Sequence, residues 1–172
     1  HQASGGRLID FGGWELPVSY AGIIQEHKQV RESVGLFDVS HMGEVFLRGP
    51  SALAAVRQLI TNNLEVPNGH AQYTAMCNPE GGIVDDLIVY RLSDEEILIC
   101  VNASNREKDF AWIRDNNPCA DVNVEDESDD WAQVAVQGRH AEAVLDGLTD
   151  ADLNALRFFG VVRGTVAGVA GC

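Results

Sequence analysis

Two adjacent carboxylates, Asp85 and Asp86, lie inside the run Gly81–Tyr90, which is otherwise apolar and rich in β-branched residues. Successive side chains of a strand point to opposite faces, so Asp86 shares a face with Ile88 and Tyr90 while Asp85 faces the other way. Apolar residues on both faces predict a central strand that is covered on each side. A carboxylate in such a strand must find a partner or hold a proton, which indicates a site. The structural alternative is an acid that is bonded to backbone amides.

Aromatic and amide side chains are expected close to Asp86. Tyr90 lies on its face of the strand, Tyr73 lies across an expected hairpin, and Asn102 ends a later strand. An acid with these neighbours can hold a flat, nitrogen-rich heterocycle by stacking and paired hydrogen bonds. The pattern is compatible with a pterin or a purine and does not choose between them.

The element that positions these residues is expected to be a β-hairpin, with strands over 72–77 and 83–90 joined by the turn Asn78–Gly82. Other expected strands cover 45–48, 97–102, 122–124, 131–137 and 161–163. Expected helices cover 23–34, 50–60, a segment that Ser104 and Glu107 open with a capping box, and a segment after Gly138 with Ala141, Val144, Leu145 and Leu148 inward. This order predicts an α+β fold with mixed or antiparallel sheets and packed helices.

The 172 residues are expected to form the N-terminal portion of a longer chain, with two βαββ-like halves at about 36–92 and 97–165 as their internal arrangement. Residues 8–17 are expected to be an irregular entry segment, because Gly12-Gly13 and Pro17 interrupt regular structure. The acidic stretch 125–130 predicts a solvated loop. The apolar run 166–172 shows no turn or cap, which indicates that the protein continues beyond it.

The net charge of −14, from 26 acidic and 12 basic residues, argues against nucleic acid and anionic membranes as partners. No run approaches the roughly 18 apolar residues of a membrane helix. The four cysteines form no C-x-x-C pair, so no metal site is expected and a reducing, cytoplasmic setting is predicted. No phosphate loop, G-x-S-x-G elbow or H-E-x-x-H helix occurs. Ser40 and His41 do not favour a hydrolase, since adjacent residues of an extended segment point apart.

Four segments closely resemble the aminomethyltransferase (T-protein) family of the glycine cleavage system: LIDFGGWELP, VRESVGLFDVSHMGEVFLRGP, YTAMCNPEGGIVDDLIVYRL and VNASNREKDFAWI. The resemblance runs along nearly the whole chain in the family's order and spacing. It implies a folate-binding fold and transfer of a one-carbon unit from the aminomethyl-bearing lipoyl arm of the H-protein to tetrahydrofolate. The products would be ammonia and 5,10-methylenetetrahydrofolate. The implied location is the cytoplasm, or the mitochondrial matrix in a eukaryote.

The resemblance also implies roles for particular residues. The family's key aspartate matches Asp86, which would orient the folate nitrogen N10. The implied folate contacts are Met42, Tyr73, Ile88, Tyr90, Asn102, Phe158 and Phe159. Where relatives carry Tyr in the last pair, a hydroxyl is missing here, while stacking is retained.

Further folate contacts of the family, a glutamate and arginines, would lie beyond residue 172, so this region alone is expected to bind folate weakly and not to turn over. Two alternatives remain open: a folate-dependent demethylase, or a folate-binding paralogue of the iron–sulfur assembly type that has no transferase activity.

Overall fold

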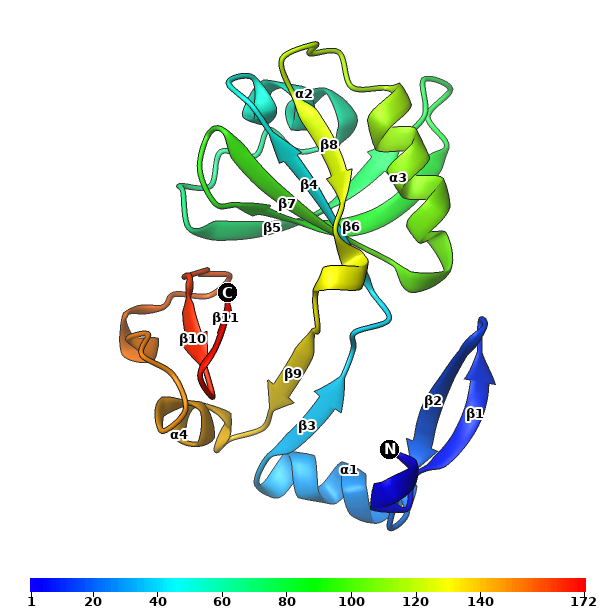
Figure 1. The fold of residues 1–172 in the computed structure, drawn as a ribbon, viewed down its shortest axis with the longest axis vertical. Coiled ribbons are helices and arrows are strands. Elements are labelled where there is room, and N and C mark those ends of the chain that lie inside the picture. The colour runs from blue at the N-terminus through cyan, green and yellow to red at the C-terminus, as the bar shows by residue number, and fades with distance from the viewer. The chain divides into compact units, whose positions relative to one another are not determined.

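The computed structural model describes residues 1–172, and these divide into two compact units. The first, here called the hairpin unit, consists of His1–His41, Gln133–Leu153 and Gly164–Gly171. The second, here called the sheet unit, consists of Met42–Ala132, Asn154–Arg163 and Cys172 (Figure 1). The prediction of an α+β fold with antiparallel sheets is confirmed.

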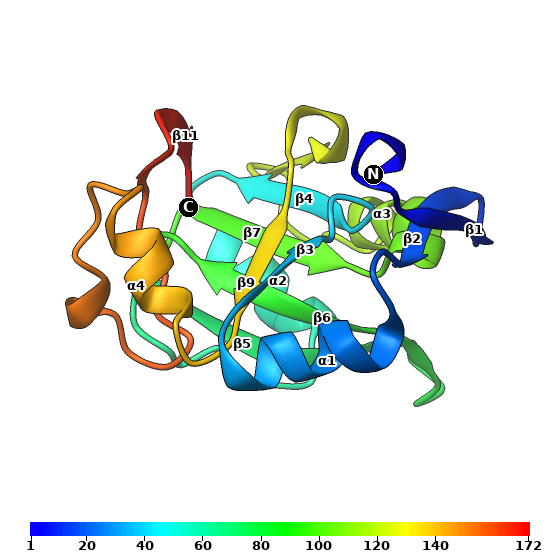
Figure 2. The ribbon, with the colours of Figure 1, turned by 90° about the horizontal axis from the view of Figure 1, so that it is seen from below.

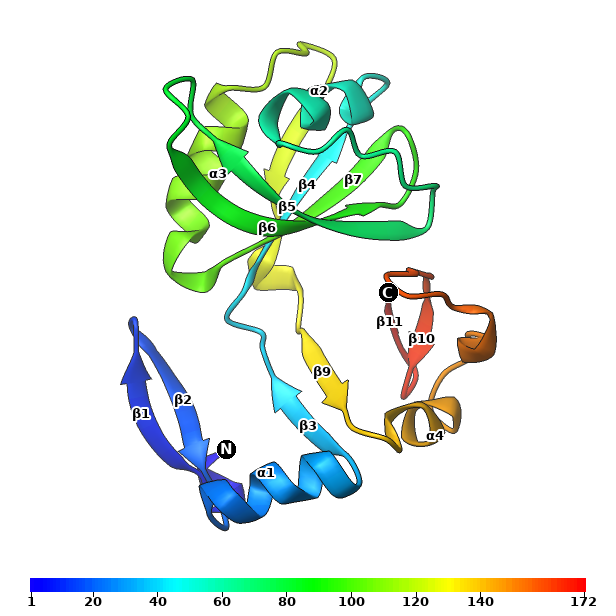
Figure 3. The ribbon, with the colours of Figure 1, turned by 180° about the vertical axis from the view of Figure 1, so that it is seen from behind.

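The sheet unit is built on five antiparallel strands in the order β5-β6-β7-β4-β8. The strands are β4 (Gly43–Arg48), β5 (His70–Cys77), β6 (Ile83–Arg91), β7 (Glu96–Val101) and β8 (Asn123–Asp126). Two helices accompany them, α2 (Ala52–Leu59) and α3 (Arg106–Asp115). Seen from below, the strands of the sheet lie in front of α2 (Figure 2). Seen from behind, α2 lies above the strands in the picture (Figure 3).

The hydrophobic core fills the space between the helices and one face of the sheet. Alternate residues of each strand enter it, among them Leu47 and Leu87, while α2 contributes Val56 and α3 contributes Ile113. The period of two along the strands and the apolar side of each helix therefore meet in one buried layer.

The expected hairpin is confirmed: β5 and β6 pair over their lengths and place Tyr73 opposite Ile88. Its turn is held by Asn78, whose Oδ1 accepts a hydrogen bond of 2.7 Å from the Gly82 amide. Gly81 adopts φ +84°, a conformation that glycine reaches without steric cost.

The expectation that this strand is covered on both faces is wrong. Along β6 the burial alternates, so Asp85 and Leu87 are buried whereas Asp86 is exposed. Helices of the sheet unit cover one face only, because the apolar sides of α2 and α3 meet the same set of alternate residues.

The hairpin unit contains three two-stranded ladders and two helices. The ladders are β1 (Arg7–Phe11) with β2 (Trp14–Ser19), β3 (Gly35–Asp38) with β9 (Val134–Gln137), and β10 (Gly164–Val166) with β11 (Val169–Gly171). The helices are α1 (Ile23–Glu32) and α4 (Ala141–Asp146).

Both ends of the chain are more regular than the sequence predicts. Residues 8–17 form most of the β1–β2 hairpin, because Gly12 and Gly13, with φ +62° and +91°, make its turn. The run 166–172 likewise contains a turn at Ala167 and Gly168, with φ +53° and +82°, between β10 and β11. In both places a pair of residues with positive φ closes a hairpin.

The acidic stretch 125–130 is a solvated loop only at its end, where Asp129 and Asp130 are exposed. Its first two residues end β8, where Glu125 lies 2.7 Å from Arg48 Nη1 and Asp126 lies 2.9 Å from Arg106 Nε. The acids are therefore held by arginines that are distant in sequence, a pairing that local composition does not reveal.

Other boundaries also differ. No capping box forms at Ser104, because residues 103–105 are a 3-10 turn and α3 begins at Arg106. The strand expected at 131–137 begins only at Val134, and the one expected at 161–163 is absent. Helix α4 is present, but none of its residues is buried, so its apolar side does not enter a core.

The sheet draws strands from both of the segments proposed as βαββ-like halves. β4, β5 and β6 come from 36–92, and β7 and β8 come from 97–165. The two compact units also follow other boundaries. The division into two βαββ-like halves stays a prediction.

Candidate functional site

The residues singled out in the sequence gather on the face of the sheet opposite α2 and α3, here called the site face. Cross-strand partners form a row across it in the order Tyr73, Ile88, Cys100 and Glu44. The next row consists of Ala71, Tyr90, Leu98 and Phe46. Asp86 on β6, Asn102 after β7 and Met42 before β4 lie on the other side of the first row. Antiparallel register thus joins side chains from positions 42 to 102.

Asp86 presents an exposed carboxylate on this face. The Tyr73 hydroxyl, diagonally across the hairpin, donates a hydrogen bond to Asp86 Oδ2. This bond to an anionic acceptor raises the pKa of Tyr73, so the phenol keeps its proton at neutral pH. The pair offers a ligand an acceptor oxygen beside an aromatic ring.

Asn102 connects the two adjacent acids, although their side chains point to opposite faces. Its Nδ2 donates to the backbone oxygen of Asp86 at 2.9 Å and to Asp85 Oδ1 at 3.1 Å. The amide therefore fixes the end of β7 against the middle of β6 at the point where Asp86 projects.

Met42, Ile88 and Tyr90 supply half-buried surface around the carboxylate. Burial, assisted by the neighbouring Cys100, raises the pKa of Tyr90 to about 12. The Tyr90 phenol is thus a neutral group that can donate a hydrogen bond to a ligand.

The aromatic pair Phe158 and Phe159 lies at the β5 edge of the sheet. The Ala71 amide donates to Phe159 O at 2.8 Å, and an isolated bridge joins His70 to Gly160. The two rings are 4.5 Å apart at 63°, and Phe158 is 89% exposed, which leaves its ring available for contact. The structure thus brings all eight candidate residues to one sheet and its edge.

Sequence reasoning missed Glu44, which lies in one row with Ile88. Glu44 is only 5% exposed, and burial raises the pKa of its carboxyl to about 7, with Arg106 opposing the shift and Asp126 adding to it. The alternation of Val45 and Leu47 toward the core could have placed Glu44 on the opposite face. Only the pairing of β4 with β7 aligns it with the candidate site.

A second missed residue is Asp109 of α3, which is fully buried on the core face beside Asp85. Burial, followed by the neighbouring Asp85, raises the pKa of Asp109 to about 7. Asp85 is buried on the side of β6 that lies behind the site face. No pattern in the sequence indicates that it meets Asp109, which lies 24 positions later.

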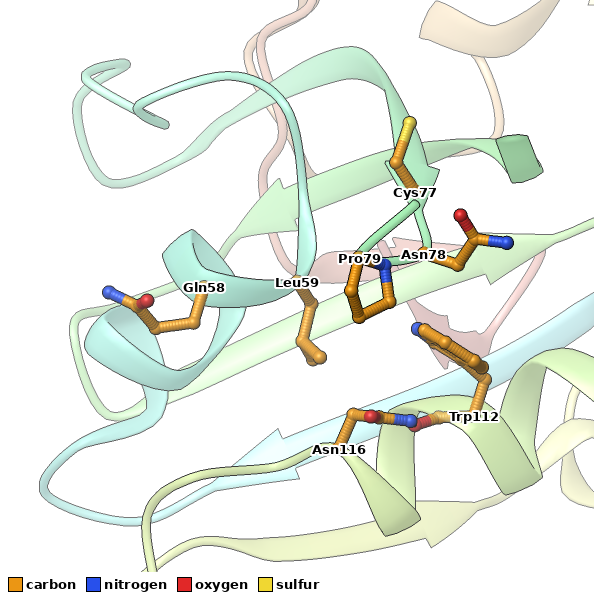
Figure 4. Close-up of a pocket in the computed structure, with 7 residues that line it drawn as sticks. All are labelled: Gln58, Leu59, Cys77, Asn78, Pro79, Trp112 and Asn116. Atoms are coloured by element: carbon orange, nitrogen blue, oxygen red, sulfur yellow. The ribbon is translucent and has the colours of Figure 1, made fainter. Parts of the chain in front are cut away.

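A separate pocket of about 330 Å³ lies between α2, the β5–β6 turn and α3. Its lining residues are Gln58, Leu59, Cys77, Asn78, Pro79, Trp112 and Asn116 (Figure 4). In the close-up the Cys77 side chain points away from the other lining residues. None of the candidate residues lines this pocket, and its lining carries no carboxylate, so the site face is the better candidate for chemistry.

A family model described as the GCVT N-terminal domain matches residues 1–172. The aminomethyltransferase of Desulfitobacterium hafniense is 49% identical over 170 residues, covering 98% of this chain and 47% of the relative. That of Bacillus subtilis is 50% identical over 159 residues, covering 92% and 44%. The chain spans about half the length of the curated relatives it matches.

Two solved structures resemble this chain. The glycine cleavage system aminomethyltransferase T from Bartonella henselae matches with a TM-score of 0.82 and 30% identity, over 93% of this chain and 44% of the other. The heterotetrameric sarcosine oxidase from Corynebacterium sp. U-96 matches with a TM-score of 0.57 and 20% identity, over 80% and 67%. The second likeness concerns the fold alone. No helix of the structure is long and apolar enough to cross a membrane.

Proposed function

This chain belongs to the family of the GCVT N-terminal domain, and from that membership we propose that its site face binds tetrahydrofolate in a glycine-cleavage aminomethyltransferase. The family match supports the reaction class, as do the curated aminomethyltransferases that are 49% and 50% identical to this chain. The single observation that carries the proposal is the exposed Asp86 carboxylate, bonded by Tyr73 and flanked by Asn102. The cytoplasmic setting is part of the proposal, in keeping with four cysteines that form no disulfide.

The donor set of the site face suits a reduced pterin and its aromatic extension. A folate offers flat rings, ring nitrogens and an amine, which require stacking surface, hydrogen-bond donors and an acceptor. Tyr90 supplies a neutral phenol, Asn102 an amide, and Met42, Ile88 and Phe158 apolar contact. These groups are of the kind that such a ligand needs.

In this proposal tetrahydrofolate accepts the one-carbon unit from the aminomethyl group on the lipoyl arm of the H-protein, with release of ammonia and of the arm as its dihydrolipoyl dithiol. Asp86 acts by accepting a hydrogen bond from the folate amine near N10, which directs the nitrogen lone pair toward the carbon. Tyr73 holds the carboxylate in that orientation from the next strand.

The net charge of −14 sets a limit on what this region does alone. Tetrahydrofolate and its polyglutamate tail are anionic, and the site face carries Glu44 and Asp86, while Arg106 beside Glu44 is already paired with Asp126 and Asp129. We therefore propose that the 172-residue chain binds folate weakly and does not turn over alone. The arginines that would hold the tail belong to other parts of the enzyme.

The test compares Asp86→Ala with Glu80→Ala, an exposed acid in the turn of the same hairpin. Both are made in an enzyme of the length of the curated relatives that contains this sequence. The measured quantities are H-protein-dependent formation of 5,10-methylenetetrahydrofolate and the Kd of tetrahydrofolate. We expect Asp86→Ala to lower kcat by about a hundredfold or more while changing Kd far less. Glu80→Ala should behave like the wild type.

Asp85→Ala completes the series, and we expect it to cost stability and some turnover, because Asp85 is buried. Equal and small effects of the Asp85 and Asp86 changes would remove Asp86 from the mechanism. Folate binding without any H-protein-dependent product would instead favour the folate-binding paralogue that lacks transferase activity.

A further inference from the structure

Behind the site face, Asp85 and Asp109 form a buried pair of carboxyl groups. Asp109 has no exposed surface and Asp85 is 7% exposed. Three of their four oxygens, Asp85 Oδ2 and both oxygens of Asp109, are buried and accept no hydrogen bond. Two ionised carboxylates are acceptors only, so neither can satisfy the other. One proton between them would supply the missing donor.

The surrounding donors favour Asp85 as the ionised member. Asn102 Nδ2 lies 3.1 Å from Asp85 Oδ1, and the Asn105 side chain also bonds to this carboxylate. Burial acts to raise the pKa of Asp85, but the bonds from Asp109, Asn105 and Asn102 together lower it. Burial and the adjacent Asp85 raise the pKa of Asp109 to about 7, so the proton lies on Asp109.

Lys108 is the other charged group that faces the pair, and it does not replace the proton. Its Nζ lies 2.9 Å from Asp109 Oδ1 and acts to lower the pKa of that carboxyl, but burial and Asp85 act more strongly to raise it, and the same Nζ donates to the Val84 backbone oxygen. The Lys108 side chain is half exposed, so water screens its charge, whereas Asp109 is enclosed by the core.

We infer that Asp109 and Asp85 share one proton at neutral pH, and that this pair acts through Asn102 to position Asp86. The chain of contacts is continuous: Asp109 bonds to Asp85, Asp85 accepts from Asn102 Nδ2, and the same Nδ2 donates to Asp86 O. Asp109 is thus a positioning residue on the far side of the sheet. The inference rests on the proposed function, since it concerns the residue assigned to turnover.

Loss of the shared proton from Asp109 should disturb the position of Asp86. Deprotonated Asp109 would place two like charges in contact inside the core, opposed only by the half-exposed Lys108. The carboxylates would separate and Asn102 would lose its fixed acceptor. We therefore expect the orientation of Asp86, and with it turnover, to deteriorate as the pH rises above about 7.

The first experiment follows aspartate side-chain carboxyl carbons by NMR in the 172-residue chain labelled with ¹³C-aspartate. We expect one resonance to titrate near pH 7 and to be absent in Asp109→Asn, whose amide keeps a donor toward Asp85. Glu107→Gln, which neutralises an exposed acid of the same helix, is the matched control and should leave that titration in place. This readout does not depend on folate or on the H-protein.

The second experiment measures turnover against pH in the longer enzyme. Asp109→Asn should keep the kcat of the wild type at pH 6.5 and lose the decline above pH 7. Asp109→Leu, which has no donor, should lower kcat by about tenfold or more with the KM for tetrahydrofolate unchanged. Because Asp109→Asn retains shape and hydrogen bonding, its pH profile remains informative even if the Leu variant does not fold.

The inference is overturned if no aspartate titrates near pH 7, or if the Asn variant keeps the wild-type decline of kcat above pH 7. Failure of the proposed function looks different. In that case the carboxyl titration is present in the wild type and absent in Asp109→Asn, but the Asp86→Ala enzyme keeps its turnover, which removes the positioning role together with the proposed function.

Discussion

Replacement of Glu44 by Gln should change how stability depends on pH. Glu44 is 5% exposed, and its folded-state pKa is about 7 compared with 4.5 for an ordinary glutamate. Burial is the main cause, because it penalises the charged form, and Arg106 opposes it only in part. The folded protein therefore binds this proton more tightly than the unfolded chain does.

The sign follows from proton linkage. A carboxyl with a raised folded-state pKa leaves stability intact below pH 4.5, and stability is lost as the pH rises through 7. A difference of about 2.5 pKa units corresponds to about 3 kcal/mol at most, at 1.36 kcal/mol per unit. Glu44→Gln carries no titrating proton, so its stability relative to the wild type should rise by up to about 3 kcal/mol between pH 4.5 and 8.5.

The assay is urea unfolding of the wild type, Glu44→Gln and Glu107→Gln at one-unit steps across that range. Glu107 is exposed on α3, so the unfolding free energy of Glu107→Gln should change with pH in parallel with that of the wild type. Other groups that titrate cancel in the difference between curves, and a constant offset from altered hydrogen bonding leaves the slope unchanged. A Glu44→Gln difference that is constant within about 0.5 kcal/mol from pH 4.5 to 8.5 would refute the reasoning.

Three further outcomes are expected from the same structure. Tyr73→Phe removes the hydrogen bond to Asp86 and should lower kcat by about threefold to tenfold with little change in unfolding free energy, measured by turnover and urea titration. Leu47→Ala, at a fully buried core position, should destabilise the chain by about 2–5 kcal/mol, whereas Ile83→Ala, which is 73% exposed, should cost under about 0.5 kcal/mol. Gly49→Ala should lower the thermal midpoint markedly, because its Cβ would lie 2.0 Å from a backbone carbonyl oxygen.

Much of the local structure around the candidate site could be predicted from sequence. Alternation along 83–90 placed Asp85 and Asp86 on opposite faces, and the Asn78–Gly82 turn predicted the hairpin that brings Tyr73 to Asp86. These features depend on residues within about twenty positions, where side-chain period and turn chemistry act directly. The β1–β2 hairpin is not predicted, because Gly12-Gly13 breaks regular structure in most contexts, yet two glycines also suit a tight hairpin turn.

The residue types and their spacing therefore predict the chemistry of the site face and its nearest neighbours, which are an acid, two tyrosines and an amide, and they indicate the family that carries these residues. Long-range packing sets three features that the residue pattern does not predict: helices cover one face of the sheet, Glu44 lies in the row of Ile88, and Asp109 meets Asp85. The reason is physical. Strand alternation is set by local backbone geometry. The order of the strands and the face of the sheet against which a helix packs are set by burial of the whole core, and residues from distant parts of the chain contribute to that core.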